Sequence, residues 1–124
     1  MPTQHYIGIM SGTSMDGADA VLIAMQGNQW QRALAHSFTP YPSSLKTALL
    51  ALQNIGKNEL HRSQMLAQEL SCLYAEVVQK LLRETQMQPA HIRAVGCHGQ
   101  TVRHAPEHGY SIQLANLPLL AEKT

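Results

Sequence analysis

The chain has 124 residues and a formal net charge of +1, with 9 basic against 8 acidic side chains. This balance gives no electrostatic reason to expect nucleic acid or an acidic membrane as a partner. Hydrophobic residues make up 44% and charged residues 14%, so the chain fits one ordinary domain with a substantial core.

The cysteines and the chain start indicate the compartment. Cys72 and Cys97 form neither a disulfide framework nor a CxxC metal pair. The first residues lack a basic segment followed by an apolar stretch of signal length, and no uninterrupted apolar segment approaches transmembrane length. We therefore expect a reduced, cytoplasmic protein without membrane contact.

Three extended segments open the chain. Residues 6–10 and 20–25 are apolar runs, and in residues 30–38 every second residue shares one face with Trp30. Turn residues at 26–29 separate the second and third runs, which predicts that these two form a β-hairpin.

Two helices are predicted next. The first begins near Pro42, which a first helical turn tolerates, and reaches Gly56. Its apolar residues recur at helical spacing: Leu45, Leu49, Leu52 and Ile55. Asn58 is a candidate cap for the second helix, which Pro89 closes. The second helix carries a stripe with a 3.6-residue period: Leu66, Leu70, Leu73, Val77 and Leu81.

Strand character returns over residues 92–102, and residues 110–114 alternate like a further strand. Asn116 and Pro118 predict the start of another helix, and the chain stops at Thr124 without a stop signal, so we expect a C-terminal truncation. The order of elements predicts an α/β protein with a mixed sheet, opening antiparallel β-hairpins and flanking helices.

The most specific feature is the segment 8–19, Gly-Ile-Met-Ser-Gly-Thr-Ser-Met-Asp-Gly-Ala-Asp, which we call the hydroxyl turn. Its glycines permit backbone conformations that aim successive N–H groups into one concavity, and its hydroxyls add donors for phosphate oxygens. A carboxylate beside phosphate needs a divalent cation between them, which indicates Mg²⁺ held through water, with Asp16 as the candidate. From composition alone, a connection rich in turn residues with no ligand explains the segment equally well.

Two familiar phosphate motifs do not describe the hydroxyl turn. It lacks the lysine of a P-loop, and its glycine spacing differs from that of dinucleotide folds. A G-x-S-x-G hydrolase elbow centred on Ser14 also fails, because its final glycine is absent.

The hydroxyl turn resembles the opening GxMSGTSxDGxD signature of the anhydro-N-acetylmuramic acid kinase family. Residues 98–101, His-Gly-Gln-Thr, and residues 113–122 are similar to an HGQT segment and a Q-x-x-N…AE stretch that follow in the same order in that family. The family belongs to the actin and hexokinase superfamily, with a ribonuclease H-like fold whose first β-hairpin grips ATP phosphates. The resemblance implies that residues 1–124 are the N-terminal phosphate-binding domain of a two-domain sugar kinase.

The resemblance also implies a reaction. The family uses ATP and water to open the 1,6-anhydro ring of anhydro-N-acetylmuramic acid and to phosphorylate it to N-acetylmuramic acid 6-phosphate, which recycles peptidoglycan. The expected cofactors are ATP and Mg²⁺, and the full-length protein is expected to be a homodimer. The residues expected to contact ATP phosphates are Gly12, Thr13, Ser14, Met15, Asp16, Gly17, Ala18 and Asp19. Those expected on the sugar side are His98, Gly99, Gln100 and Thr101.

One part of the family pattern is missing from this chain. The family's general-base aspartate comes from an Asp-Phe-Arg pattern, which does not occur here. We therefore predict no catalytic residue in this chain and little or no activity from it alone. The alternatives are a non-catalytic nucleotide- or sugar-binding module and a folding domain without a ligand.

The histidines allow two other interpretations. Cys97 next to His98 could indicate thiol catalysis, but adjacent residues on a strand point to opposite faces, which favours a buried cysteine. A second interpretation takes four residues as metal ligands: His98, His104, Glu107 and His108. No predicted helix fixes their spacing, so solvated loop side chains are favoured.

Overall fold

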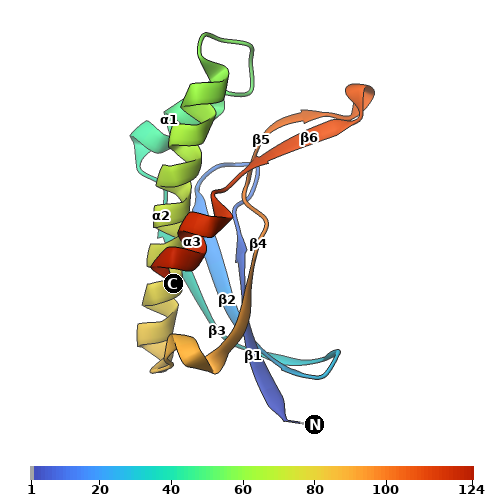
Figure 1. Cartoon of the computed structure of the whole chain (residues 1–124), viewed down its shortest axis with the longest axis vertical. Helices are drawn as coiled ribbons and strands as arrows, with labels where there is room; N and C mark the ends of the chain where they lie inside the picture. The colour runs from blue at the N-terminus through green and yellow to red at the C-terminus, as the bar shows by residue number, and fades with distance from the viewer. Residues whose placement is uncertain (1) are drawn as a thin grey trace.

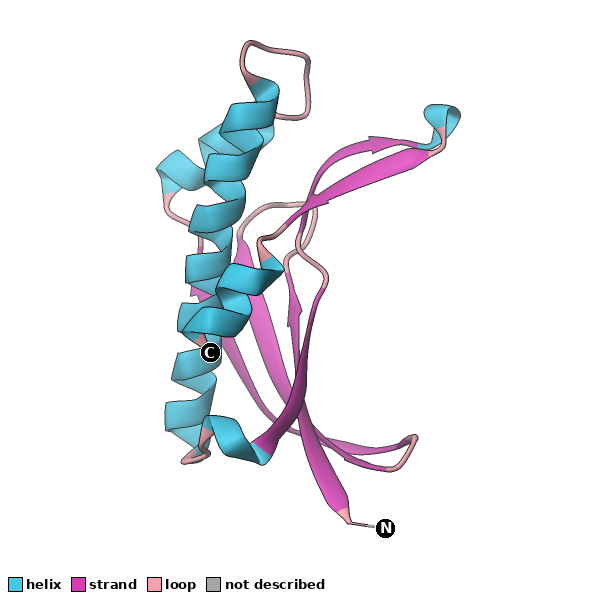
Figure 2. Cartoon of the chain, viewed as in Figure 1, coloured by secondary structure: helices cyan, strands magenta, loops and turns pink. Residues whose placement is uncertain are grey.

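The computed structural model describes residues 2–124, which contain six strands, three α-helices and two short 3-10 helices at Pro89–His91 and Pro106–His108 (Figures 1 and 2). The strands are β1 (Thr3–Met10), β2 (Gly17–Gln26), β3 (Gln29–Pro40), β4 (Ile92–Cys97), β5 (Gln100–Ala105) and β6 (Tyr110–Leu114). The helices are α1 (Ser43–Ala51), α2 (Glu59–Thr85) and α3 (Leu117–Lys123).

The main sheet has the order β3-β2-β1-β4. β1, β2 and β3 pair antiparallel, whereas β4 runs parallel to β1, so the sheet is mixed. α2 lies along one face of this sheet and packs against β2, β3 and α3 (Figure 1). The predicted α/β class, the mixed sheet and the opening hairpins are therefore confirmed, in the arrangement expected of an actin- or hexokinase-like N-terminal domain.

The core fills the space between α2 and the sheet. The alternating residues Ile7 and Ile9 of β1 point into it, as does Leu22 of β2. Each leucine buried in this way stabilises the fold by about 1.5–3 kcal/mol relative to an exposed one. All members of the predicted α2 stripe are buried: Leu66, Leu70, Leu73, Val77 and Leu81.

The prediction for the end of the first helix was wrong. α1 ends at Ala51, and Ile55, placed on its apolar stripe, is 92% exposed. Past the helix end the chain is held in another way, because the guanidinium of Arg103 donates to the carbonyl oxygens of Leu52 and Asn54. Those carbonyls accept from a side chain and not from a further helical turn.

The caps of the next two helices differ. Asn58 occupies the N-cap position of α2, but it adopts a left-handed conformation and its side chain accepts no capping hydrogen bond. Asn116 caps α3 as predicted, because its side-chain oxygen accepts a hydrogen bond from the backbone N–H of Leu119 at 3.1 Å.

The predicted strand over residues 92–102 is two strands. β4 ends at Cys97, and β5 begins at Gln100 and pairs with β6 in a separate two-stranded sheet. The break lies at Gly99, whose φ of +79° is one that strand residues do not adopt. The resulting β5–β6 hairpin projects away from the main sheet (Figure 1).

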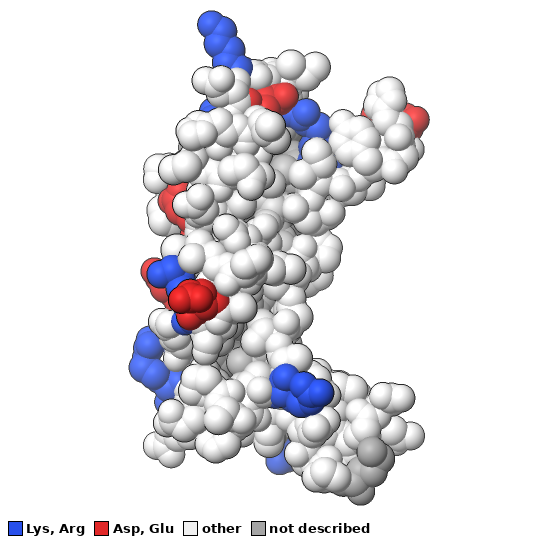
Figure 3. Space-filling model, viewed as in Figure 1, with Lys and Arg blue, Asp and Glu red and all other residues white. Residues whose placement is uncertain are grey.

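Charge is sparse over the surface. On the face drawn in Figure 3, acidic and basic side chains are scattered and most of the visible surface is uncharged. Within residues 2–124, no helix combines the length and apolar character needed to span a bilayer.

Candidate functional site

The hydroxyl turn connects β1 to β2, and its tip is exposed. Gly12, Thr13 and Ser14 are exposed, whereas Met15 is fully buried and anchors the turn in the core. Met15 has a φ of +56°, and its N–H donates to the carbonyl oxygen of Gly12 at 3.1 Å. A left-handed conformation at a residue other than glycine costs free energy and is often found at functional turns.

The second half of the predicted phosphate segment enters β2. Gly17 and Ala18 are buried, so these two residues can offer a ligand only backbone groups. The carbonyl oxygen of Asp16 accepts from the N–H of Tyr41 at 2.9 Å, which ties the end of the turn to the segment after β3.

The two carboxylates of the turn have different partners. Asp16 Oδ1 accepts from Lys46 Nζ of α1 at 3.1 Å, and Asp19 Oδ1 lies 2.7 Å from Nε2 of His36 on β3. The hydrogen bond from Lys46, with a smaller one from Ser14, lowers the pKa of Asp16. Asp16 is therefore an ionised, exposed carboxylate beside hydroxyls, a donor set that fits a hard divalent cation.

The segment 98–101 lies beside the hydroxyl turn. β4 is parallel to β1, and the N–H of His98 donates to the carbonyl oxygen of Ile9 at 3.2 Å. Ser11 Oγ donates to the carbonyl oxygen of Gly99 at 3.0 Å. The structure thus brings together the two segments that the sequence singled out, although they are far apart along the chain.

The four residues of the second segment differ in exposure. His98 is exposed, with Nδ1 3.2 Å from the carbonyl oxygen of Gly99, and Thr101 is half-buried. Gln100 is 0% exposed. Its Nε2 donates to the carbonyl oxygens of Gly12 at 3.2 Å and Thr101 at 3.1 Å. All of its hydrogen-bonding capacity on that nitrogen is used inside the protein.

Two tyrosines that the sequence interpretation missed complete the surroundings. Tyr41 donates its hydroxyl to Gln100 Oε1 at 3.0 Å, and the hydroxyls of Tyr41 and Tyr74 lie 3.5 Å apart. Tyr74 OH lies 2.9 Å from Ser11 Oγ. Burial raises the pKa of both tyrosines, so both remain neutral donors. Tyr74 falls at the helical spacing of the α2 stripe. A polar tyrosine at an apolar position of this stripe is the one sequence signal that could have predicted its buried hydroxyl.

Cys97 is not an activated nucleophile. Burial raises the pKa of its thiol, whereas catalytic cysteines have a lowered pKa. His98, the next residue, is engaged with the carbonyl oxygen of Gly99. The thiol-catalysis interpretation therefore has no support in the geometry.

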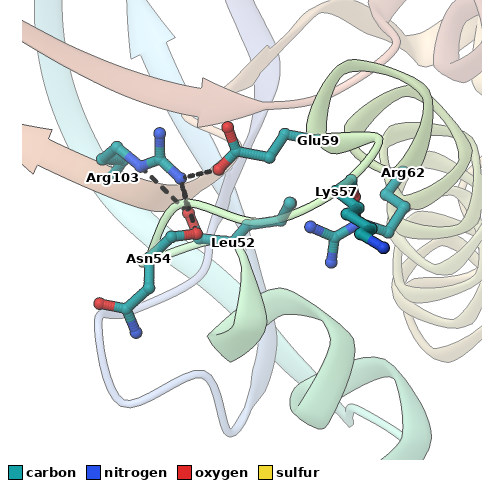
Figure 4. A network of polar contacts seen from close by, with 6 residues as sticks. All are labelled: Leu52, Asn54, Lys57, Glu59, Arg62 and Arg103. Carbon is teal, nitrogen blue, oxygen red and sulfur yellow. Dashed lines mark hydrogen bonds and ion pairs between the residues drawn. The ribbon is translucent and has the colours of Figure 1, made fainter.

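A polar cluster fixes the middle of β5 to the loop after α1 (Figure 4). Arg103 of β5 donates to the carbonyl oxygen of Leu52 at 2.7 and 3.2 Å and to that of Asn54 at 3.0 Å. It also forms an ion pair with Glu59 at the start of α2. Chiefly through this hydrogen bond, Arg103 holds the pKa of Glu59 below its ordinary value.

The Glu59 pair is expected to make stability depend on acid pH. A carboxyl with a lowered folded-state pKa contributes stability that is present above its unfolded pKa, about 4.3, and lost as the pH falls through the lower folded-state value. Urea unfolding at several pH values between neutrality and pH ~3 should show a steeper loss of stability for the wild type than for Glu59→Gln. Parallel pH profiles for the two proteins would contradict this role.

Comparison with known proteins identifies one family. A family sequence model described as anhydro-N-acetylmuramic acid kinase matches residues 4–124. Curated proteins of that description are 67% identical over 124 residues in Neisseria meningitidis serogroup C (strain 053442) and 53% identical over 123 residues in Nitrosomonas europaea. These matches cover 100% and 97% of this chain but only 34% and 33% of the relatives. The chain spans about a third of the length of the curated relatives it matches.

Proposed function

Because the chain belongs to the anhydro-N-acetylmuramic acid kinase family, we propose that it is the part of an ATP-dependent sugar kinase that holds the phosphates of the nucleotide. The proposed reaction of the whole protein is the hydrolytic ring opening and phosphorylation of anhydro-N-acetylmuramic acid to N-acetylmuramic acid 6-phosphate. The proposed domain is residues 1–124, the N-terminal domain of a two-domain enzyme that forms a homodimer.

One observation carries the proposal. The exposed hydroxyl turn follows β1, the segment 98–101 follows the parallel strand β4, and hydrogen bonds join the two. The carboxyl ends of parallel strands meet at one edge of a sheet, and this edge is where ligands bind in open α/β sheets. The shared position of the two segments at this edge supports the proposed ligand site.

The residues of the turn suit phosphate chemistry. Thr13 and Ser14 are exposed, and their hydroxyls would donate to phosphate oxygens together with backbone N–H groups near Gly12. For Ser14 this donation would replace its present hydrogen bond to Asp16. Asp16 would hold Mg²⁺ through water. When bound, Mg–ATP supplies the phosphoryl group and neutralises the developing charge, so the task of these residues is to position it.

The other residues have separate proposed roles. Met15, Gly17 and Ala18, whose side chains are buried or absent, would contribute backbone groups only. Asp19, at the end of the turn, would contribute to the nucleotide-phosphate site. In the ligand-free chain its carboxylate contacts His36.

On the sugar side, His98 and Thr101 carry polar groups that a ligand can reach, and Gly99 offers only backbone. The side chain of Gln100 is fully buried and cannot contact the sugar directly. Its proposed role is to hold the neighbouring residues that do. No Asp-Phe-Arg pattern supplies a water-activating base, so we expect little or no ADP release by this chain alone in a coupled assay containing the anhydro-sugar.

Calorimetric titration with Mg–ATP tests the proposal. We expect weak binding by the wild type and about tenfold weaker binding by Thr13→Val, the loss typical of one hydrogen bond to a charged group. Thr47→Val is the matched control, because Thr47 is an exposed threonine on α1 and not part of the turn. Equal affinities for all three proteins would exclude the hydroxyl of Thr13 from the phosphate site.

A further inference from the structure

A buried polar network lies directly beneath the exposed face of the hydroxyl turn. Its members come from four parts of the fold: Ser11, Tyr41, Tyr74 and Gln100. All four side chains are buried, Tyr74 and Gln100 completely. Buried polar groups at this position need a reason, because apolar residues of the same size would pack there at lower desolvation cost.

The four side chains form two chains of hydrogen bonds that lie side by side. The one proton of Ser11 Oγ goes to the carbonyl oxygen of Gly99, so Tyr74 OH of α2 donates to Ser11 Oγ at 2.9 Å. The Tyr41 hydroxyl lies 3.5 Å from Tyr74 OH. Tyr41 donates to Gln100 Oε1 at 3.0 Å. In an interior of low dielectric, a network whose members are all paired holds each of them in one arrangement, since breaking any link leaves an unsatisfied group.

Both ends of the network contact backbone that belongs to a proposed ligand segment. Gln100 Nε2 donates to the carbonyl oxygen of Gly12, a residue 88 positions earlier, at 3.2 Å. In return, Ser11 Oγ donates to the carbonyl oxygen of Gly99, also 88 positions away, at 3.0 Å. Two reciprocal side-chain-to-backbone hydrogen bonds therefore join the hydroxyl turn to the segment 98–101.

The Gly12 carbonyl is the central link. It accepts from Gln100 Nε2 and also from the N–H of Met15, the hydrogen bond that closes the turn. The position of the Gln100 amide therefore sets where this carbonyl points. The N–H of Thr13 shares the planar peptide group of this carbonyl, so the same hydrogen bond fixes its orientation.

We infer that Tyr41 and Gln100 are positioning residues that make the hydroxyl turn and the segment 98–101 one mechanical unit. A displacement of either segment is transmitted to the other through the Gln100 amide and the Ser11 hydroxyl. That these segments hold the phosphates and the sugar rests on the proposed function. The mechanical coupling rests on the hydrogen bonds alone.

Amide hydrogen exchange of the ligand-free chain tests the coupling. In Tyr41→Phe and Gln100→Met, the Met15 amide and its neighbours in the turn should exchange about tenfold faster than in the wild type after correction for global stability. Tyr41→Phe removes a single hydroxyl, so it keeps the test available if Gln100→Met does not fold.

Ser71→Ala is the matched control. Ser71 is also fully buried, and its hydroxyl oxygen accepts from the N–H of Asn116 at 2.7 Å, outside the network. This variant loses a buried hydrogen bond of the same kind, so it should accelerate exchange around Asn116 and leave the turn as in the wild type. Unchanged exchange at Met15 in both network variants, or the same acceleration in Ser71→Ala, would overturn the inference.

A titration with Mg–ATP, followed by the amide resonances, separates the inference from the proposed function. In the wild type, resonances of the turn and of Gly99 and Thr101 should shift together, whereas in Gln100→Met only those of the turn should shift. Shifts confined to the turn of the wild type would overturn the coupling. No shift at the turn, with the exchange result as expected, would reject the phosphate site and leave the coupling established.

Discussion

Replacing Gly17 by alanine is expected to destabilise the fold by about 3 kcal/mol, at the upper end of the range for overpacking substitutions. A Cβ at Gly17 would lie 2.4 Å from the carbonyl oxygen of Thr39, 2.6 Å from Phe38 Cζ and 2.8 Å from Pro40 Cα. Two of these atoms are backbone of β3, which pairs with β2 at this position. The strands must separate to admit the methyl group, at the point where the hydroxyl turn ends.

Thermal unfolding followed by circular dichroism measures this effect. A loss of about 3 kcal/mol corresponds to a fall in Tm of roughly 10 °C for a domain of this size. Gly96→Ala in β4 is the control, because its Cβ would meet no atom within 4 Å, and its stability should stay within about 0.5 kcal/mol of the wild type. Similar Tm values for Gly17→Ala and Gly96→Ala would contradict the close approach of β3 to Gly17.

Gly99→Ala is the second substitution expected to have a large effect, again about 3 kcal/mol of lost stability. Two costs add here. A φ of +79° costs a residue with a Cβ about 1 kcal/mol, and the Cβ would lie 2.7 Å from the carbonyl oxygen of Leu114. Leu114 ends β6, so the contact also disturbs the pairing of Gln100 with Leu114.

Gly109→Ala separates the two costs. Gly109 has the same φ of +79°, but a Cβ there would meet no atom within 4 Å. Chemical denaturation should therefore show a loss of about 1 kcal/mol for Gly109→Ala and about 3 kcal/mol for Gly99→Ala. Equal losses would mean that the backbone conformation alone makes Gly99 necessary and that Leu114 can move aside.

The elements that the sequence predicted correctly are those determined by nearby residues. The hairpin of β2 and β3, the buried stripe of α2 and the cap at Asn116 each depend on residues within a few positions of one another. Hydrophobic period and turn chemistry act at that range, so they could be inferred without the fold.

The errors concern features that distant residues determine. α1 stops before Ile55, and the residues just after it are held by Arg103, which donates to the carbonyl oxygen of Leu52 from 51 positions later. The predicted single strand over residues 92–102 divides at Gly99, where the chain leaves the main sheet and β5 pairs with β6. The hydrophobic pattern of the sequence continues past Ala51 and past Gly99. It holds no information about Arg103 or β6, the partners that interrupt the two elements.

The candidate site shows the same division. The sequence indicated the hydroxyl turn and residues 98–101 by their composition and by a family resemblance, and the structure places the two segments together. The pattern could not indicate that Gln100 is enclosed, because that depends on Tyr41 and Tyr74 arriving from other elements. Lys46, the partner of Asp16, was missed for the same reason.

The most direct test of a metal-dependent phosphate site in the hydroxyl turn is the calorimetric titration with ATP in the presence and absence of Mg²⁺, made on the wild type, Asp16→Asn and Gly12→Ala. A Cβ at Gly12 would meet only Ser14 Oγ, at 3.8 Å, so Gly12→Ala should fold normally and report on the close approach of a ligand. We predict weak binding by the wild type that requires Mg²⁺ and that both variants lose. Binding that is indifferent to Mg²⁺, binding retained by both variants, or no binding by a folded wild-type chain would contradict this account.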